Sequence, residues 1–407
     1  MSRIKNFLSR YLPMPNRRAV QQFKDLKQKV ESIEKKLDIT LKQPLLANTP
    51  NDMHDQNAKL INDNKKLHYY GQALKRELEL CLGRSIIDEF YQLPDSVRID
   101  ASTLCQLDCP ACYMRLNDSG FVGKGYVKFD DFKNFIDRHS YIKSVELANN
   151  GEIFLNPDIS SIIQYAFKKN VKLRANAGVN FNTVSDEVIK ALVKYRFAVM
   201  TISIDGASQD VYSAYRRNGN YNRVLENIKK LNKYKKEYKS DYPKLVWQYV
   251  IMEHNEDDVI NAKVQAKQLD MEIRFKLTWD RNYTPKKTEM LTKETGLLFF
   301  TRESRVANDT KKINRFAACK QLFTDPQINY DGRLLGCCCV YKSDFGVNVF
   351  EIGLEEALKS DQVSYAKKLL QGKLAPASLS EHLQKVIPCI DCGYYKQMVQ
   401  SEVYIEF

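Results

Sequence analysis

Residues 104–115 read LCQLDCPACYMR, and they place Cys105, Cys109 and Cys112 in a C-x3-C-x2-C spacing. This stretch directly follows residues 96–101, a β-branched run of the kind that forms strands. Three thiolates on one loop can each bind one iron of a 4Fe–4S cluster and leave the fourth iron open, whereas structural zinc takes four protein ligands. The spacing therefore predicts an iron–sulfur cluster with one open iron; cysteines with a purely structural role are the alternative.

A regular alternation of strands and helices extends outward from this loop. The expected strands are 96–101, 144–148, 172–175, 199–204, 246–252 and 272–276, and the helical patterns between them are 129–138, 159–169, 186–195, 221–234 and 255–269. Repeated strand–helix–strand units predict a parallel sheet with right-handed crossovers. We expect an α/β fold, a partial (β/α)6 TIM-like barrel whose chemistry lies at the carboxyl ends of its strands.

Composition narrows the functional class. The 407 residues include ten cysteines and five histidines and carry a net charge of +13. The sequence contains no HExxH, GxSxG, Walker or GxGxxG motif, so zincin, α/β-hydrolase, P-loop and Rossmann sites are not expected. No apolar run approaches the roughly 18 to 20 residues of a membrane span, and the first residues do not form a secretory signal. We expect a cytoplasmic protein, in which cysteines serve metal or redox chemistry.

Taken together, these features resemble the radical S-adenosylmethionine (SAM) superfamily with a C-terminal SPASM/twitch-type domain. The resemblance covers about residues 97–392. It implies that Cys105, Cys109 and Cys112 hold a 4Fe–4S cluster and that SAM chelates the open iron. It further implies that reductive cleavage of SAM gives a 5′-deoxyadenosyl radical that removes a substrate hydrogen. Ala111 departs from the aromatic residue that the family usually carries before its third cysteine.

Four further segments match the family in order and place. Asn149-Asn150-Gly151-Glu152-Ile153 resembles the GGEP motif, in which Gly151 would allow close backbone approach and Glu152 would accept from the SAM ammonium group. The resemblance assigns further SAM contacts to Asn176, to Ser203 and Asp205 in a SIDG-like segment, and to Arg217 in a YRxGG-like stretch. Gln248 and Asn255 flank the end of the fifth strand. A polar turn and an exposed basic helix end are the structural alternatives for Glu152 and Arg217.

A second set of cysteines lies near the C-terminus. Cys319, Gly332 and Cys337 give C-x12-G-x4-C, and Cys389 and Cys392 follow in PCIDCGYY. The resemblance implies one auxiliary 4Fe–4S cluster on Cys319, Cys337, Cys389 and Cys392, with no open iron; a four-cysteine zinc ribbon is the alternative. Asp331-Gly332 is typical of a hairpin turn.

Three domains are expected: a helical, coiled-coil-like appendage at 1–90, the radical SAM barrel at 91–300 and a small α+β SPASM-type domain at 301–407. The basic amphipathic start, with Ile4, Phe7, Leu8 and Tyr11, fits either peripheral membrane docking or packing against protein. No specific binding of nucleic acid is predicted.

The cysteine spacings do not identify the substrate. We expect oxidation or epimerisation of a carbohydrate or small metabolite, with peptide or protein maturation as the alternative, and a reducing donor such as flavodoxin or ferredoxin. No catalytic acid or base can be named. A non-catalytic scaffold stapled by zinc or a cluster is the alternative from another class.

Overall fold

A computed structural model of the chain describes residues 93–116, 120–278, 280–298, 300–301, 319–337, 343–400 and 404–405. Residues 93–407 form one compact unit. The predicted appendage at 1–90, including its amphipathic start, lies outside the described residues, and the predicted boundary near residue 300 stays a prediction.

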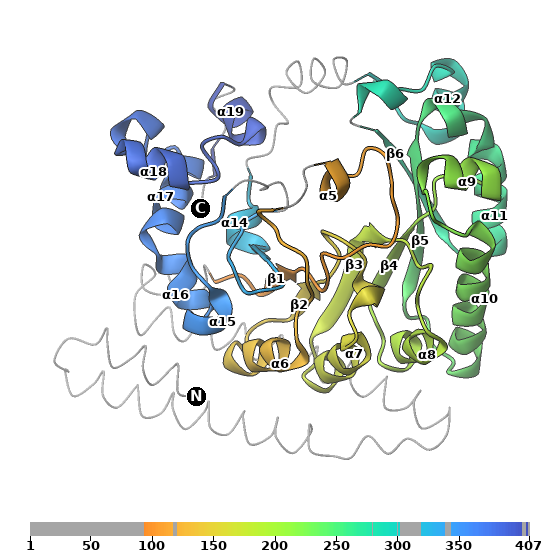
Figure 1. The fold of residues 1–407 in the computed structure, drawn as a ribbon, viewed down its shortest axis with the longest axis horizontal. Coiled ribbons are helices and arrows are strands. Elements are labelled where there is room, and N and C mark those ends of the chain that lie inside the picture. Colours follow the sequence, from red (N-terminus) through yellow and green to blue (C-terminus); the bar gives the residue numbers. More distant parts are fainter. Residues whose placement is uncertain are drawn as a thin grey trace, which may run out of the picture. The chain divides into compact units, whose positions relative to one another are not determined.

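A seven-stranded parallel sheet forms the centre of this unit, in the order β6-β5-β4-β3-β2-β1-β7 (Figure 1). Its strands are β1 Ser96–Ile99, β2 Ser144–Glu146, β3 Lys172–Val179, β4 Val199–Ser203, β5 Lys244–Ile251, β6 Glu272–Leu277 and β7 Gln327–Ile328. The six predicted strands are thus present and parallel. The α/β fold with a partial TIM-like barrel is confirmed, and β7 adds a seventh strand beside β1.

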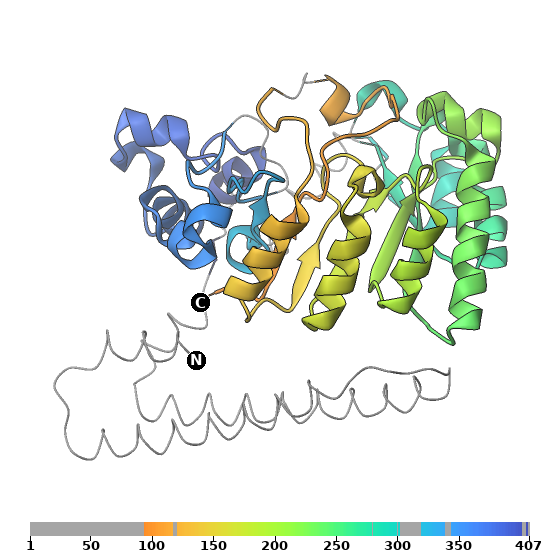
Figure 2. The ribbon, with the colours of Figure 1, turned by 60° about the horizontal axis from the view of Figure 1, so that its bottom comes forward.

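Helices connect successive strands and run along one side of the sheet, as two views show (Figures 1 and 2). In the strand-rich part they are α5 Tyr113–Leu116, α6 Phe129–Arg138, α7 Ile159–Lys168, α8 Asp186–Lys194, α9 Gln209–Tyr215, α10 Tyr221–Glu237, α11 Val259–Gln268 and α12 Thr288–Thr295, with 3-10 turns η1 Ile153–Leu155, η2 Glu253–Asp258 and η3 Arg281–Tyr283. Five of the α-helices correspond to the predicted segments. Helix α9 was not predicted; the Ser208 side chain caps it by accepting from the amide of Val211.

The C-terminal part is mainly helical. It contains α14 Gln321–Thr324, α15 Val349–Ile352, α16 Leu354–Lys359, α17 Asp361–Leu370, α18 Glu381–Val386 and α19 Gly393–Gln400, with the 3-10 turn η4 Pro376–Ser378. The predicted turn at Gly332 has φ +88°, and an antiparallel bridge joins Ile328 and Leu334 across it. A second antiparallel bridge joins Arg333 to Asn348. This part of the chain is joined to the barrel because β7 pairs with β1 in the same sheet.

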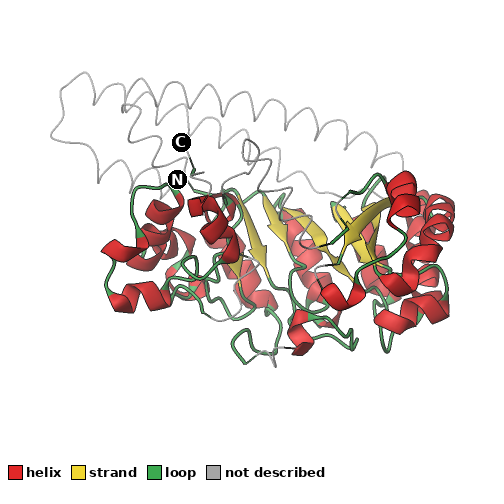
Figure 3. Ribbon diagram, turned by 90° about the horizontal axis from the view of Figure 1, so that it is seen from above, coloured by secondary structure: helices red, strands yellow, loops and turns green. Residues whose placement is uncertain are grey.

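The two faces of the sheet differ in polarity, because successive side chains of a strand alternate between them. Val97, Leu173, Ile202 and Trp247 are buried on the face that the helices cover. The register also aligns the residues of the opposite, inner face, which include Val199, Val246 and Val250. The polar residues of this face are Arg98, Glu146, Arg174, Asn176, Thr201, Ser203, Gln248, Arg274 and Lys276. Figure 3 shows the strands from above. The apolar face supplies the core, and the polar face is free to build a site.

Candidate functional site

The cysteine loop leaves the carboxyl end of β1. Its backbone folds back at the second and third cysteines, where the amide of Cys112 donates to the carbonyl of Cys109 at 3.0 Å. Desolvation, together with the negative charges of Glu152, Cys109 and Cys112, raises the pKa of Cys105 to about 11. These couplings show that the structure brings the three predicted cysteines together beside Glu152.

Gly151 allows the GGEP-like segment to pass directly under this loop. Its φ is +64°, and a Cβ there would lie 2.5 Å from the carbonyl oxygen of Ser102 and 2.7 Å from that of Leu104. The next amide, that of Glu152, donates to the carbonyl of Leu104 at 2.7 Å. The close backbone approach expected for this glycine is therefore present, and its partner is the cysteine loop.

Glu152 is buried, with 1% of its surface exposed. Its Oε1 accepts from the amide of Phe154 at 3.3 Å and its Oε2 from the amide of Asn180 at 2.5 Å. Burial raises the pKa of this carboxyl to about 7, although the backbone hydrogen bonds oppose the rise. The carboxylate therefore joins the end of β2 to the end of β3, and its predicted contact with the SAM ammonium group stays a prediction.

Asn180, which the sequence did not single out, links the same elements to the first cysteine. Its Nδ2 lies 3.6 Å from the Sγ of Cys105, and its Oδ1 accepts from Nε2 of Gln106 at 2.9 Å. The expected strand ended at residue 175, whereas β3 continues to Val179, so that Asn180 is the residue at its carboxyl end. A polar residue directly after a strand would have indicated a site residue here. The sequence did not reveal Asn180 because the expected strand ended too early, at residue 175.

A buried ion pair between Asp205 and Arg216 also lies beside the cysteine loop. Asp205, fully buried, accepts from Nε and Nη2 of Arg216 at 2.7 and 2.6 Å, and its second oxygen accepts from the amide of Val250 at 2.7 Å. Nη1 of Arg216 lies 3.7 Å from the Sγ of Cys109. Burial raises the pKa of Cys109, and the positive charge of Arg216 counteracts this rise.

The predicted arginine, Arg217, is exposed, and the carbonyl of its backbone accepts from the amide of Asp108 in the cysteine loop at 3.1 Å. Arg216, the preceding residue, supplies the side chain that enters the site. Burial disfavours its charge, but Asp205 and Cys109 outweigh that effect and raise the pKa of the guanidinium. The role of Arg217 as a carboxylate partner stays a prediction.

The remaining predicted residues lie on the inner face. Asn176 donates from its amide and its Nδ2 to Glu146 at 2.6 and 2.9 Å. Glu146, which was not predicted, is buried at the end of β2, where burial raises its pKa. Ser203 accepts from Nε2 of Gln248 at 3.2 Å, and Asn255 donates to the carbonyl of Asp205 at 3.1 Å. Of these residues, Glu152 and Asp205 follow β2 and β4 and Ser203 ends β4, whereas Asn176 and Gln248 lie within β3 and β5.

The C-terminal cysteines form a second group. Burial raises the pKa of Cys389 well above its usual value, and the neighbouring charges of Cys337, Cys319 and Cys392 add to it. All four predicted cysteines line one apolar cavity together with Leu322, Phe345 and Tyr395. Cys338 and Cys339 lie outside the described residues.

Within the described ranges, no three His, Cys, Asp or Glu side chains converge on a position for a single metal ion. A 4Fe–4S cluster instead bonds each thiolate to a different iron, so its ligands surround a volume. Cys105, Cys109 and Cys112 fit such a group by their donor chemistry and mutual electrostatic coupling, and Cys319, Cys337, Cys389 and Cys392 fit by the same criteria.

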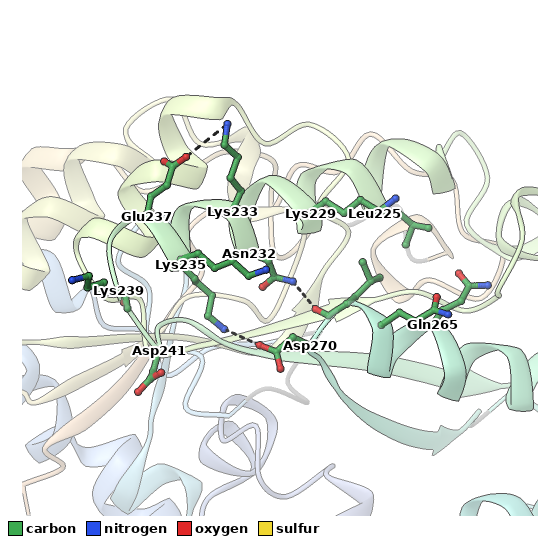
Figure 4. A pocket seen from close by; sticks show the side chains of 14 residues that line it. Leu225, Lys229, Asn232, Lys233, Lys235, Glu237, Lys239, Asp241, Gln265 and Asp270 are labelled. Atoms are coloured by element: carbon green, nitrogen blue, oxygen red, sulfur yellow. Dashed lines mark hydrogen bonds and ion pairs between the residues drawn. The ribbon is translucent and has the colours of Figure 1, made fainter. Parts of the chain in front are cut away.

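A cleft of about 1320 Å³ lies elsewhere, between α10 and α11 (Figure 4). Lysines and acidic side chains line it, and two of them, Lys235 and Asp270, are paired at 3.8 Å. It lies near residues 238–243, which precede β5, and so at the amino ends of the strands. This cleft is therefore separate from the cysteine loop.

None of the described helices combines the length and hydropathy that crossing a membrane requires.

Solved structures share the fold. The chain is similar to Streptococcus suis SuiB bound to S-adenosylmethionine, with a TM-score of 0.53 and 15% identity over 86% of this chain and 88% of that one. It is also similar to SuiB bound to its precursor peptide SuiA, with a TM-score of 0.54 and 15% identity over 82% and 80%.

Sequence relatives cover shorter segments. The chain is 24% identical over 190 residues to AlbA of Bacillus subtilis (strain 168), an antilisterial bacteriocin subtilosin biosynthesis protein; this covers 45% of the chain and 40% of AlbA. It is 27% identical over 137 residues to the uncharacterized protein MJ0804 of Methanocaldococcus jannaschii, covering 33% and 43%. The chain thus spans less than half the length of these curated relatives.

The family model described as the radical SAM superfamily matches residues 100–261. This range begins directly after β1 and contains the cysteine loop, Glu152 and the Asp205–Arg216 pair. Members of this superfamily use a 4Fe–4S cluster and SAM. Residues 100–261 thus form a radical SAM domain.

Proposed function

We propose that this enzyme modifies a peptide or protein by removing a hydrogen atom from it. Two relatives support this substrate class: AlbA acts in the biosynthesis of a bacteriocin, and SuiB has been solved with its precursor peptide. The carbohydrate or small metabolite that we expected first from the sequence has no support of this kind. A non-catalytic scaffold is equally unsupported, because the family match includes the cysteine loop to which we assign a cluster with one open iron.

The observation that carries the proposal is the convergence of Cys105, Cys109 and Cys112 at the carboxyl edge of the sheet, beside Glu152 and Arg216. We assign the three cysteines as ligands of the 4Fe–4S cluster. When bound, the cluster and SAM supply a 5′-deoxyadenosyl radical. The contribution of the chain itself is placement: Gly151 and Asn180 fix the first cysteine against the ends of β2 and β3.

We assign Glu152, Asn176, Ser203 and Asp205 to the binding of SAM. Glu152, Ser203 and Asp205 lie at the carboxyl ends of β2 and β4, where ligands of such barrels bind, and Asn176 lies within β3 between these strands. Hydrogen bonds from neighbouring residues, such as Asn180 to Glu152 and Gln248 to Ser203, hold these side chains in place before SAM binds, which lowers the entropy lost on binding. Arg216 keeps Asp205 in position and brings positive charge to Cys109.

We propose that Cys319, Cys337, Cys389 and Cys392 hold one auxiliary 4Fe–4S cluster. Their shared apolar cavity and mutual electrostatic coupling support this assignment. If the reaction is an oxidation, this cluster is a candidate acceptor for the electron of the substrate radical. A reduced flavodoxin or ferredoxin remains the proposed donor to the first cluster.

The first test measures SAM cleavage. The full chain is reconstituted with iron and sulfide without oxygen, reduced with SAM present, and assayed for 5′-deoxyadenosine by chromatography. Cys109→Ala should abolish the product, whereas Cys81→Ala, an equal change outside both cysteine groups, should leave it. No product from the wild-type chain, or an undiminished yield from Cys109→Ala, would contradict the proposal.

The second test identifies the substrate class. Short peptides encoded beside the gene and a panel of carbohydrates are supplied with deuterium at their carbon positions. We expect deuterium in 5′-deoxyadenosine from a peptide and a matching mass change in that peptide. Transfer from a carbohydrate alone would reject the peptide assignment and leave the radical chemistry intact.

A further inference from the structure

Strand β6 presents two cations on the inner face of the sheet. The register pairs Arg274 with Gln248 and Lys276 with Val250. Phe275, between them, makes an edge-to-face contact with Tyr249 at a centroid distance of 5.7 Å, and Tyr249 is fully buried. Because neighbouring side chains of a strand point to opposite faces, Arg274 and Lys276 both project from the inner face.

Together, Arg274 and Lys276 make fewer ion pairs among the described residues than the two arginines at the other end of the same face. Arg98 and Arg174 share the carboxylate of Asp325, at 2.9 and 3.4 Å. Arg274 reaches only Glu272 of its own strand, at 3.8 Å, and Lys276 makes no ion pair within the described part of the chain. Two like charges side by side on one face of a sheet destabilise each other. An anion that contacted both would remove this repulsion.

The pair lies beside the proposed SAM site. Gln248, in register with Arg274, donates to Ser203, while its Oε1 is buried and has no donor among the described residues. Burial and the charge of Arg274 lower the pKa of Lys276, while the charge of Asp205 raises it. A group bound here would thus meet two cations and one unused acceptor beside the residues assigned to SAM.

We propose that Arg274 and Lys276 bind a carboxylate of the peptide substrate, and that Gln248 accepts from a neighbouring N–H of the same peptide. The inference rests on the proposed function and names its substrate class more closely. Carboxylates and cations form charge-assisted hydrogen bonds, and an arginine fork matches both carboxylate oxygens. The carboxylate comes from an acidic side chain or from the C-terminus of the peptide.

The experiment measures binding, so it does not depend on turnover. The full chain, reconstituted with its clusters and SAM, is immobilised without oxygen and exposed to two pools of randomised octapeptides. One pool has free C-terminal carboxylates and the other has C-terminal amides, and retained peptides are sequenced by mass spectrometry. The variants are Arg274→Gln/Lys276→Gln and Arg274→Glu/Lys276→Glu, and Lys229→Glu/Lys233→Glu on α10 is the charge-matched control.

We expect the wild-type chain and the control to enrich peptides with a carboxylate about tenfold, the value of one charge-assisted hydrogen bond. Enrichment of Asp and Glu in both pools identifies a side chain, and preference for the free-carboxylate pool identifies the C-terminus. The glutamine variant should lose the preference, and the glutamate variant should prefer Lys and Arg. Circular dichroism melts should show that both variants remain folded.

Two results would overturn the inference in different ways. The wild-type chain could retain peptides without preferring a carboxylate, or the glutamine and glutamate variants could keep the preference. Either result would reject the role of Arg274 and Lys276 and leave the proposed function intact. Retention of no peptide above bare resin would reject peptide binding itself, and the proposed function with it.

Discussion

Replacement of Arg216 by methionine should destabilise the protein and leave a buried charge without its partner. Arg216 makes two short hydrogen bonds to Asp205, and Asp205 is fully buried. Methionine retains much of the side-chain volume but supplies no donor. Among the described residues, the remaining carboxylate would keep only the amide of Val250 as a partner.

The size of this effect follows from the burial of the pair. Removing one partner of a buried ion pair costs about 3 to 5 kcal/mol. The side chain of Arg216 is 17% exposed, so we take the lower limit, about 3 kcal/mol. For a unit of about 300 residues the entropy of unfolding is about 0.6 kcal/mol per kelvin, so the melting temperature should fall by about 5 °C.

The assay is anaerobic thermal unfolding of the full chain, with and without its clusters, because bound groups stabilise the folded state separately. Asp205→Asn/Arg216→Met should recover most of the loss, since asparagine is uncharged and still accepts from Val250. Lys233→Met is the matched control: its pair with Glu237 is exposed and should contribute less than about 0.5 kcal/mol. A single variant within 1 °C of the wild type, or a double variant less stable than the single one, would refute this reasoning.

Three other changes test the site. Gly151→Ala places a Cβ 2.5 Å from the carbonyl oxygen of Ser102, at a φ of +64°. We therefore expect this variant to lose the iron of the first cluster, as measured by iron analysis. Gly296→Ala is the control, because Gly296 has a φ of +71° with open space around it. Asp100 is fully buried, and burial raises the pKa of its carboxyl from 3.8 to about 7, so the folded state binds the proton more tightly. The free energy of unfolding should therefore fall by up to about 1.4 kcal/mol per pH unit between about pH 4 and pH 7, relative to Asp100→Asn. Urea unfolding measures this fall, and parallel pH curves for the wild type and the variant would contradict it. Cys389→Ser/Cys392→Ser should reduce the iron content from about eight to about four per chain, because each cluster carries four irons; a full complement, or four irons with stoichiometric zinc in the wild-type chain, would reject the auxiliary cluster.

The segments that the sequence predicted well are those whose signal is local. The ends of α6 match the predicted ones because Phe132, Phe135 and Ile136 repeat at helical spacing and are buried together. Strand β4 could be recognised because a short β-branched run lies between two polar segments. The cysteine spacing is equally local, since one loop carries all three thiols.

The short elements could not be predicted. Strand β7 has two residues, too few for any periodicity, and it exists because β1 offers a free edge to a segment more than two hundred residues away. Helix α9 has seven residues, and its only local signal is the cap at Ser208. Such elements are stabilised by their tertiary contacts rather than by their own propensity.

By itself, the sequence determined the cysteine loop, the six parallel strands and the order of the motifs, because these depend on spacing and side-chain polarity along a short stretch of chain. Only the tertiary structure decided that Arg216 rather than Arg217 meets Asp205, and that Asn180 reaches Cys105. Adjacent residues at a helix end point in different directions, and packing selects the one that enters the site. Only the register of β5 and β6 placed Arg274 beside Gln248, because strand pairing joins residues that are remote in the chain.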